Sequence, residues 1–333
     1  MAVMLGFEAL QGVLAMRDAI DLLEKTLFHE AAGRTLVSPK FNTDFENGSM
    51  RVLVAADQEA GYLVTKAYHT IQGVGVRYVV SLYRLKDGEL LAALDGQLIT
   101  DLRTGAASGV IARKVPVSGP VSVGVIGSGN QARTQLEALA SVYRVASAAV
   151  YSPTAAHREA YAREMSAKLG IPVTAVASAE AAARGRTVVV TASNSRSSEP
   201  VLRGEWLDRC RLLCAVGNTR PQFAEADARC FRDASLVVVD SLHAFEEAGD
   251  LRQAVASGAI AEGKRTTLAQ IVTGAIAVPQ TGLVAFKSVG TALQDLALAA
   301  RYYELIGSRP GLPVAPDLAR LRQPLRAGGA ARS

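Results

Sequence analysis

Cysteine is scarce in this sequence, and its few copies fit neither a disulfide framework nor a metal site. The 333 residues contain three, at Cys210, Cys214 and Cys230, and their spacing matches neither pattern. Cys214 lies in an apolar, strand-like run and is most simply a small core residue. We therefore expect no disulfide, no bound metal and a reducing, cytoplasmic compartment.

Long apolar runs are missing as well. No run reaches the length needed to cross a bilayer, and the N-terminus lacks the basic region and small-residue cleavage site of a signal peptide. A hydrophobic content of 49% and a charged content of 20% are typical of a soluble globular protein. We expect about two domains and no membrane partner.

The balance of charge is slightly basic, with 36 Lys and Arg against 31 Asp and Glu and a net charge of +5. Much of the excess lies near the C-terminus, and a basic tail of this kind can bind nucleic acid. No aromatic residues alternate with these arginines, whereas Pro, Gly and Ala surround them. The pattern therefore favours a solvated or loosely packed tail, and we expect no nucleic-acid partner. The arginines are Arg301, Arg309, Arg320, Arg322, Arg326 and Arg332.

The first third of the chain consists of short apolar runs separated by turns. An apolar stripe over residues 19–27 predicts an amphipathic helix, and residues 86–89 are typical of a hairpin turn. We expect a mainly antiparallel sheet, then a helix over residues 101–114 and a linker at 116–120. The predicted strands are 50–55, 62–67, 78–85 and 90–98.

After residue 120, strands and helices alternate, which predicts a doubly wound parallel sheet and an α/β fold. We expect the last helix to leave this sheet and return to the first part of the chain. The predicted strands are 121–126, 148–151, 173–176, 187–191, 211–216, 236–240 and 283–286. The predicted helices are 133–143, 155–169, 179–184, 224–230 and 291–306.

A glycine-rich loop stands between the first strand of this region and its helix. Gly127, Gly129 and Ala132 form the pattern G-x-G-x-x-A, the dinucleotide-binding fingerprint when a strand precedes it and a helix follows. The first glycine allows a tight turn, the second lets the backbone approach a pyrophosphate, and Ala132 keeps helix and strand close. Free N–H groups at the helix N-terminus would then meet the phosphates. The alternative is a purely structural glycine turn.

No acidic residue stands at the end of the second strand of this region. Proteins that prefer NAD usually place Asp or Glu there to bond the ribose 2′-hydroxyl, and none occurs before Glu159. Ser152 and Thr154 can donate hydrogen bonds to a 2′-phosphate, and Arg158 can supply positive charge. The pattern favours NADP(H) and leaves NAD(H) open. It also fits a helix N-cap followed by an exposed arginine.

Further motifs occur in a fixed order around the glycine loop. Residues 93–109 contain a segment close to T-x-x-R-T-A-A. Together with the fingerprint, these motifs resemble the ornithine cyclodeaminase/mu-crystallin family over roughly residues 10–310. The remaining motifs are residues 217–221, 239–240 with 249–251, and 286–290 with 294–295.

This resemblance implies a domain organisation and an assembly. It implies a Rossmann domain at residues 117–295, inserted into a mixed α+β domain made of residues 1–116 and 296–333. The mixed domain would bind substrate and pair two copies into a homodimer. A small amino or imino acid would lie in the cleft between the domains, against the nicotinamide.

Three residues match functional positions of this family. Lys66 aligns with the active-site lysine, and an ammonium in an apolar strand is costly unless paired; the alternative is an edge-strand lysine that faces solvent. Arg103 aligns with the arginine that grips the substrate carboxylate, a task suited to its planar fork; the alternative is a surface or interdomain salt bridge. Asp295, in the last of the motifs, would orient Lys66 or the nicotinamide amide; the alternative is a helix cap or a purely structural ion pair.

Other positions are expected to contact the cofactor because they lie in the glycine loop or in the motifs around it. Thr104 opens the helix over residues 101–114 together with Arg103. The full set is Thr104, Gly127, Gly129, Asn130, Gln131, Ala132, Ser152, Thr154, Arg158, Thr191, Ser193, Gly217 and Thr219.

Two positions depart from the family pattern. The family often has an arginine after a proline upstream of its lysine, where this chain has Lys40; Arg51 is nearer in sequence, and either is a candidate for the substrate carboxylate. Ornithine cyclodeaminases carry Asp where this chain has Thr219, as the acid that handles the second amine of ornithine. A hydroxyl cannot balance an ammonium, so cyclisation of a diamino acid is not expected.

These residues predict an NAD(P)H-dependent oxidoreductase that acts on the C=N or CH–NH bond of a small amino or imino acid. It would be an imine or ketimine reductase or an amino-acid dehydrogenase. Two alternatives stay open. One is an ornithine cyclodeaminase that forms proline and ammonia with bound NAD⁺. The other is a non-catalytic NADPH-dependent binding protein.

Overall fold

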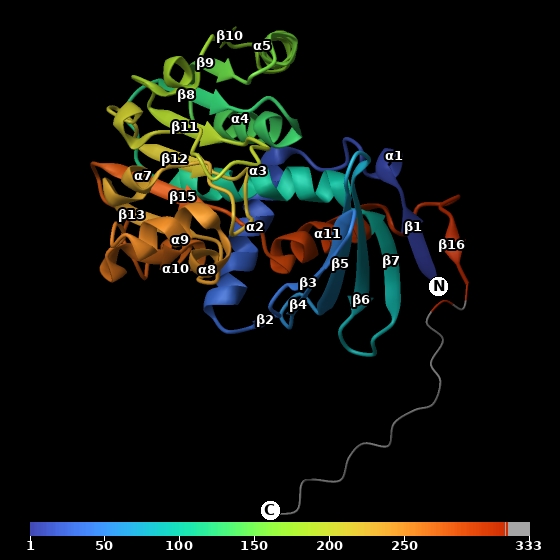
Figure 1. The fold of residues 1–333 in the computed structure, drawn as a ribbon. Helices are drawn as coiled ribbons and strands as arrows, with labels where there is room; N and C mark the ends of the chain where they lie inside the picture. Colours follow the sequence, from blue (N-terminus) through green and yellow to red (C-terminus); the bar gives the residue numbers. More distant parts are fainter. Residues whose placement is uncertain (317, 319–333) are drawn as a thin grey trace, which may run out of the picture.

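The computed structural model describes residues 1–316 and 318 and contains two eight-stranded sheets. Figure 1 shows the sheet of the N-terminal strands on one side and the sheet of the central strands on the other. No helix within the described residues is both long enough and apolar enough to cross a membrane. Four arginines of the basic tail, Arg320, Arg322, Arg326 and Arg332, lie outside the described residues.

The first sheet is mixed. Its order is β16-β1-β7-β6-β5-β4-β2, and β3 pairs with β4. β1 runs parallel to β7, and the other pairs are antiparallel. The strands are β1 (Ala2–Leu5), β2 (Thr35–Val37), β3 (Phe41–Phe45), β4 (Gly48–Asp57), β5 (Tyr62–Ile71), β6 (Gly75–Arg84), β7 (Leu90–Asp95) and β16 (Val314–Ala315).

The predicted boundary between the last of these strands and the helix that follows it is wrong, and the strand predicted over residues 62–67 continues to Ile71. The strand expected over residues 90–98 ends at Asp95, and helix α3 (Gly96–Lys114) begins well before residue 101. Asp95 is the reason, because its carboxylate accepts a hydrogen bond from the N–H of Gln97 at 2.9 Å and caps the helix. The early start places Thr100 and Arg103 inside the helix, where they share one face three residues apart.

The second sheet is entirely parallel, as the alternating pattern predicts. Its order, β10-β9-β8-β11-β12-β15-β13-β14, reverses direction between β8 and β11, which is where a doubly wound sheet binds its ligand. The α/β fold class is therefore confirmed. The strands are β8 (Val121–Ile126), β9 (Val145–Tyr151), β10 (Val173–Ala175), β11 (Val188–Thr191), β12 (Leu212–Ala215), β13 (Ala234–Val239), β14 (Arg265–Thr267) and β15 (Leu283–Lys287).

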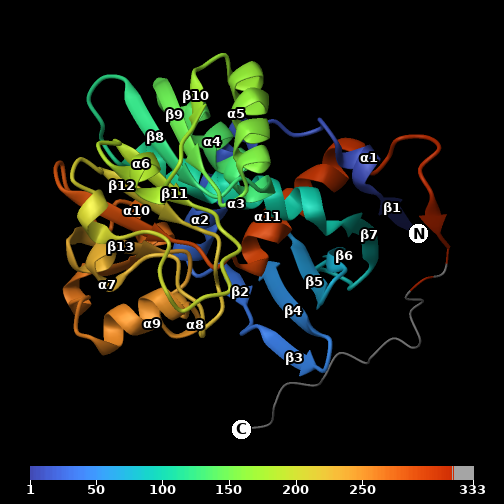
Figure 2. The same cartoon turned by 45° about the horizontal axis from the view of Figure 1, so that its top comes forward.

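Helices cover the faces of this parallel sheet (Figure 2). The helix predicted over residues 224–230 is wrong, since α7 starts only after Asp227, whose carboxylate caps the N–H of Cys230. Residues 224–226 are not helical: Ala226 forms an isolated parallel bridge with Leu202, and the Glu225 carbonyl accepts bonds from the N–H groups of Val201 and Leu202. The helices are α4 (Asn130–Val142), α5 (Ala155–Leu169), α6 (Ala179–Ala183), α7 (Ala228–Arg232), α8 (Ala244–Glu247), α9 (Gly249–Ala256) and α10 (Leu268–Val272), with short 3₁₀ turns at Gly204–Trp206 and Glu262–Lys264.

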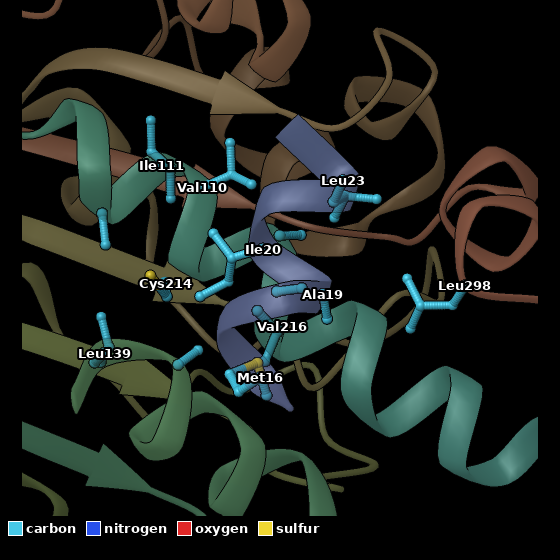
Figure 3. Close-up of a cluster of buried hydrophobic side chains, with 14 of the residues drawn as sticks. Met16, Ala19, Ile20, Leu23, Val110, Ile111, Leu139, Cys214, Val216 and Leu298 are labelled. Atoms are coloured by element: carbon cyan, nitrogen blue, oxygen red, sulfur yellow. The ribbon is translucent and has the colours of Figure 1, made fainter. Parts of the chain in front are cut away.

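Helix α2 (Met16–Ala31) joins the two sheets through one continuous core. Its apolar stripe, predicted from residues 19–27, is buried against α3 and α4, and Figure 3 shows Ile20 among side chains from both halves. Gly105 of α3 lets the helices approach, because a Cβ there would lie 2.7 Å from the Thr134 carbonyl oxygen. Full burial of an aliphatic side chain such as Ile20 contributes about 2 kcal/mol.

The last long helix, α11 (Ala292–Ile306), returns to the first sheet. It packs on β4 and β5 and also contacts α2 and α3. The prediction that this helix leaves the parallel sheet is confirmed. Short helix α1 (Phe7–Leu10) follows β1. The return of α11 carries Asp295, in its first turn, to the strand that holds Lys66.

Candidate active site

The glycine loop has the backbone that a pyrophosphate requires. Gly127 adopts φ +116°, and a Cβ there would collide with the carbonyl oxygen of Ala192. Gly129 is the N-cap of α4, and nothing lies within 4 Å of the position of its missing Cβ. Ala132 is fully buried in the following helix. The loop therefore leaves open space in front of unbonded helix N–H groups, which fits a dinucleotide.

A cavity of about 470 Å³ adjoins this loop at the ends of β8, β9 and β11. Ser152 lines it, and its hydroxyl accepts a bond from Ser128 at 2.9 Å. Arg158 lies just behind, where its guanidinium donates to the carbonyls of Ser152 and Pro153 at 2.9 and 3.2 Å. Thr154 caps α5 without a side-chain bond. Of the three residues predicted to read the ribose, only Ser152 therefore faces the cavity.

The side chains that follow Gly129 connect the two halves of the molecule. Asp101 of α3 accepts hydrogen bonds from the amides of Gln131 at 2.8 Å and Asn130 at 3.3 Å. Burial raises the pKa of the Asp101 carboxyl to about 6. The cofactor loop is thus tied to the helix that carries Arg103. No sequence motif marks Asp101 for this role.

Glu225 is a second residue that the sequence analysis missed. Its carboxylate is fully buried and accepts bonds from the N–H and hydroxyl of Ser193 and from the N–H groups of Gly217 and Asn218, all at 2.7–2.8 Å. The hydroxyl of Thr191 also points to it, at 3.4 Å. The predicted cofactor residues Thr191, Ser193 and Gly217 are therefore brought together, but Glu225 occupies both hydroxyls.

Lys66 is completely buried on β5. Its Nζ donates to Oδ1 of Asp295 at 2.7 Å and to Oγ1 of Thr100 at 2.6 Å, and it lies 5.1 Å from the ring centre of Tyr78. The alternative of a solvent-facing lysine is wrong. Burial lowers the pKa of Lys66 to about 8; the Asp295 carboxylate acts in the opposite direction, and the Arg103 charge lowers it further. An ammonium with a pKa near neutrality is suited to proton transfer.

Asp295 connects the lysine to the predicted carboxylate-binding arginine. Its Oδ1 also accepts from Nε of Arg103 at 3.3 Å, while Nη1 of Arg103 donates to Gln294 at 3.3 Å. Oδ2 of Asp295 is buried without a hydrogen-bond partner among the described residues. Two cations and one carboxylate share this site, so one positive charge is left for an anionic substrate.

A cavity of about 150 Å³ lies over this cluster. Residues from both sheets line it, including Tyr68 and Tyr78 of the first and Val216 and Thr219 of the second. The structure thus brings six of the predicted site residues to one cavity. Those that line the cavity are Lys40, Lys66, Arg103, Thr104, Gln131 and Thr219. Within the described chain, no group of three or more metal-ligating side chains occurs.

The two candidate carboxylate-binding residues differ in their surroundings. Lys40 is neutralised by Glu247 of α8, at 2.7 and 2.9 Å from its two carboxylate oxygens. Arg51 does not line the small cavity, but lies in the adjoining pocket and donates to the Tyr68 hydroxyl at 3.3 Å. Only Lys40 therefore touches the cavity, and its charge is already balanced.

Buried acids fix the loops around the cavity. Asp240 accepts from the hydroxyl of Ser288 at 2.8 Å and from the N–H of Gly290 at 2.6 Å. Gly290 has φ +75°, and a Cβ there would lie 2.7 Å from Nη2 of Arg103. The loop after β15 therefore holds the guanidinium in place from one side.

Comparison with known proteins identifies the family. The family model of the ornithine cyclodeaminase/mu-crystallin family matches residues 2–309. An alanine dehydrogenase from Archaeoglobus fulgidus is 30% identical over 313 residues, which cover 89% of this chain and 92% of that protein.

Solved structures agree over nearly the whole length. The Delta(1)-pyrroline-2-carboxylate reductase of Thermococcus litoralis, in complex with NADH and L-proline, has a TM-score of 0.86 at 30% identity and covers 91% of this chain and 97% of its own. An archaeal alanine dehydrogenase dimer with bound NAD has a TM-score of 0.84 at 27% identity, covering 91% and 95%. The protein is a member of the ornithine cyclodeaminase/mu-crystallin family.

Proposed function

We propose that this chain is an NAD(P)H-dependent oxidoreductase that reduces the C=N bond of a small imino acid, or oxidises the corresponding amino acid. The observation that carries the proposal is the buried Lys66–Asp295–Arg103 cluster, which opens into a cavity beside the glycine loop. Relatives named for both kinds of activity support it.

The residues of the cluster have separate tasks in this reaction. Arg103 binds the substrate carboxylate, since it lines the small cavity and its Nη2 makes no protein hydrogen bond in the described chain. Lys66 transfers a proton from Nζ to the imine nitrogen. A dihydronicotinamide held by the glycine loop would supply a hydride for the imine carbon, by which C=N becomes CH–NH. Asp295 accepts hydrogen bonds from both Lys66 and Arg103 and so fixes their relative positions. Its negative charge also raises the pKa of Lys66, which favours the charged ammonium.

The two rival functions have less support. An ornithine cyclodeaminase needs an acid for the second amine, and no Asp or Glu in the described residues lines the small cavity or the pocket around Arg51. Glu246 and Glu247 line the pocket on the Lys40 side, where Glu247 is already paired with Lys40. A pure binding protein has no use for a buried lysine, whose burial without function costs free energy. Lys66 and Thr219 therefore favour the reductase.

The proposed cofactor is NADP(H), with NAD(H) as the weaker alternative. Ser152 is available at the ribose end of the cavity, and Arg158 adds positive charge close behind it. No acidic side chain lines this cavity in the described residues to bond a 2′-hydroxyl. The related structures with NADH and NAD show that the family also accepts the unphosphorylated cofactor.

The direct test is oxidation of NADPH and NADH, followed by absorbance, with cyclic imino acids and with α-keto acids plus ammonia or methylamine. We expect steady oxidation with at least one imine and tighter binding of NADPH. NADH binding tenfold tighter, about 1.4 kcal/mol, would contradict the cofactor assignment. Ammonia released from ornithine with no net change in NAD⁺ would establish the cyclodeaminase instead.

A homodimer is proposed through the face of the first sheet that lies opposite Lys66. Phe41, Val52, Ala67 and Val79 form one cross-strand row on that face, and Phe41 and Val79 are 64% and 52% exposed. Exposed apolar rows of this kind mark interfaces. Light scattering should give twice the chain mass of 35.0 kDa, and V79R should shift it toward one chain. A monomeric wild type would contradict the assignment.

Two further assignments belong to this proposal. We assign residues 117–295 to the cofactor domain and residues 1–116 with 296–333 to the substrate and dimerisation domain, of which residues 317 and 319–333 lie outside the described part. The separate sheets support this division. Helix α11 begins at Ala292 and packs on the first sheet, so its first turn belongs with the substrate domain. We place the protein in the cytoplasm. Its three cysteines, all free and buried, suit a reducing compartment.

A further inference from the structure

A second pocket adjoins the small cavity over the Lys66 cluster. Its volume is about 510 Å³, and it lies between the β5–β6 hairpin of the first sheet and the loops after β11 and β12 of the second. Tyr68, Tyr78 and Thr219 line both spaces. A substrate held at Lys66 can therefore reach this second pocket, which we call the outer pocket. Another pocket adjoins the small cavity on the Lys40 side, but its lysine is already paired with Glu247.

The charge of the outer pocket is one-sided. Arg51, Arg196 and Arg220 line it, and no Asp or Glu does so within the described part of the chain. None of the three arginines forms a salt bridge within residues 1–316 and 318, and Arg51 contacts only the neutral Tyr68 hydroxyl. Unpaired guanidinium groups around a cleft attract an anion and can bind it through two parallel hydrogen bonds.

The strand register sets where this anion would lie. Arg51 stands opposite Tyr68, and Tyr68 opposite Tyr78, in the row of β4, β5 and β6 next to Lys66. Tyr68 is two residues from Lys66, so both point to the same face, about 7 Å apart along the strand. An anion at Arg51 is therefore one row from the imine that Lys66 protonates, a separation that a short carbon chain spans.

The loop after β12 contributes the second arginine. Its backbone is fixed, because the N–H of Arg220 donates to the Asn218 side chain at 3.1 Å and its carbonyl accepts from Gly249 at 3.2 Å. Arg196 differs from the other two. It follows Asn194 and Ser195, which also line the cavity beside the glycine loop, so it lies closest to the cofactor.

We propose that the substrate is an α-imino dicarboxylic acid, whose distal carboxylate binds Arg51 and Arg220 in the outer pocket. This inference rests on the proposed reductase function. The α-carboxylate binds Arg103, the imine nitrogen faces Lys66, and the second carboxylate extends past Tyr68 and Thr219. The reaction consumes NAD(P)H and one proton and yields an amino dicarboxylic acid.

The test compares matched keto acids with ammonia under NADPH oxidation by the wild-type protein. Oxaloacetate and 2-oxoglutarate are compared with pyruvate and 2-oxopentanoate, which lack the distal carboxylate. A further comparison uses 2-oxoglutaramate, in which an amide replaces the distal carboxylate of 2-oxoglutarate. We expect kcat/KM at least about tenfold higher for a dicarboxylate, the usual contribution of a charge-assisted hydrogen bond. Equal or better use of the uncharged substrates overturns the inference and leaves the reductase standing. No oxidation with any imine overturns both.

Arginine variants locate the anion. R51Q and R220Q should each lower kcat/KM for the dicarboxylate by roughly ten- to hundredfold, while kcat/KM for 2-oxopentanoate falls much less. R51K should retain part of the preference for the dicarboxylate, since lysine keeps the positive charge but lacks the bidentate guanidinium. The affinity for NADPH is measured in parallel. If it falls tenfold in R51Q or R220Q while the substrate preference is unchanged, the anion is a cofactor phosphate and the inference is wrong.

Discussion

Replacing Lys66 with alanine is expected to lower turnover by roughly 10²–10⁴-fold, the usual contribution of a general acid. Lys66 donates a hydrogen bond to Asp295 from strand β5, and its side chain lines the small cavity. The glycine loop lies on the other sheet, tied to α3 through Asp101. The affinity for NADPH should therefore remain close to that of the wild type.

The two readouts separate chemistry from folding. Fluorescence titration of NADPH checks that the cofactor cavity is intact, and initial rates of imine reduction measure the loss. Lys168→Ala is the matched control, because this half-exposed lysine bonds only Glu137 on the surface of the cofactor sheet. Activity that survives in K66A would remove Lys66 from the mechanism. A wild type that binds NADPH and reduces no imine would instead favour the binding protein.

The parts of the fold that local sequence determines were predicted well. The alternation of strands and helices after residue 120 reflects short continuous apolar runs in the strands, helical patterns between them and glycine at the first turn. Those signals are local, so the parallel sheet and the position of the cofactor loop followed from them. The resemblance to the family added Lys66, Arg103 and Asp295, which the structure places within hydrogen-bond distance.

The missed residues depend on contacts between distant segments. Glu225 stands in Ala-Glu-Ala-Asp, which suits a helix, and its role appears only where the loops after β11 and β12 meet it. The pairing of Lys40 with Glu247 joins segments 207 residues apart. Nothing local to either residue indicates such a partner, because a charged side chain on an exposed helix or loop gives the same pattern.

The start of α3 shows a different limit. The segment from Leu90 to Leu98 is mostly apolar, which predicts a strand. The one side chain that indicates a helix start is Asp95, which caps α3. Gly96 follows it, a residue that ordinarily weakens a helix. The helical conformation is favoured over a longer strand because the early helix start buries Ile99 in the core and places the Thr100 hydroxyl within hydrogen-bond distance of Lys66.

Replacing Asp295 with asparagine is expected to move the alkaline limb of the pH profile to lower pH. In the wild type, burial lowers the pKa of Lys66 to about 8, and the Asp295 carboxylate raises it against that effect. Without the carboxylate, burial and the Arg103 charge remain, so the pKa falls further. Lys66 then loses its proton at a lower pH, and the loss of kcat/KM that begins near pH 8 in the wild type should begin earlier.

Stability should fall in the same variant for a related reason. Asn keeps an oxygen that can accept a hydrogen bond from Lys66, but it removes the negative charge that Lys66 and Arg103 share. Breaking a buried ion pair in this way lowers the free energy of unfolding by about 3–5 kcal/mol. The destabilisation alone does not identify a functional residue. A control that breaks another buried pair is therefore needed.

Asp250→Asn provides that control. Asp250 is as buried as Asp295 and pairs with the buried Lys287 at 2.8 Å, but neither residue lines the small cavity. Both variants should lower Tm, and only D295N should move the limb of kcat/KM. Partial recovery of D295N activity at acidic pH would follow from a protonated Lys66. An alkaline limb that stays near pH 8 in D295N would mean that Lys66 is not the acid.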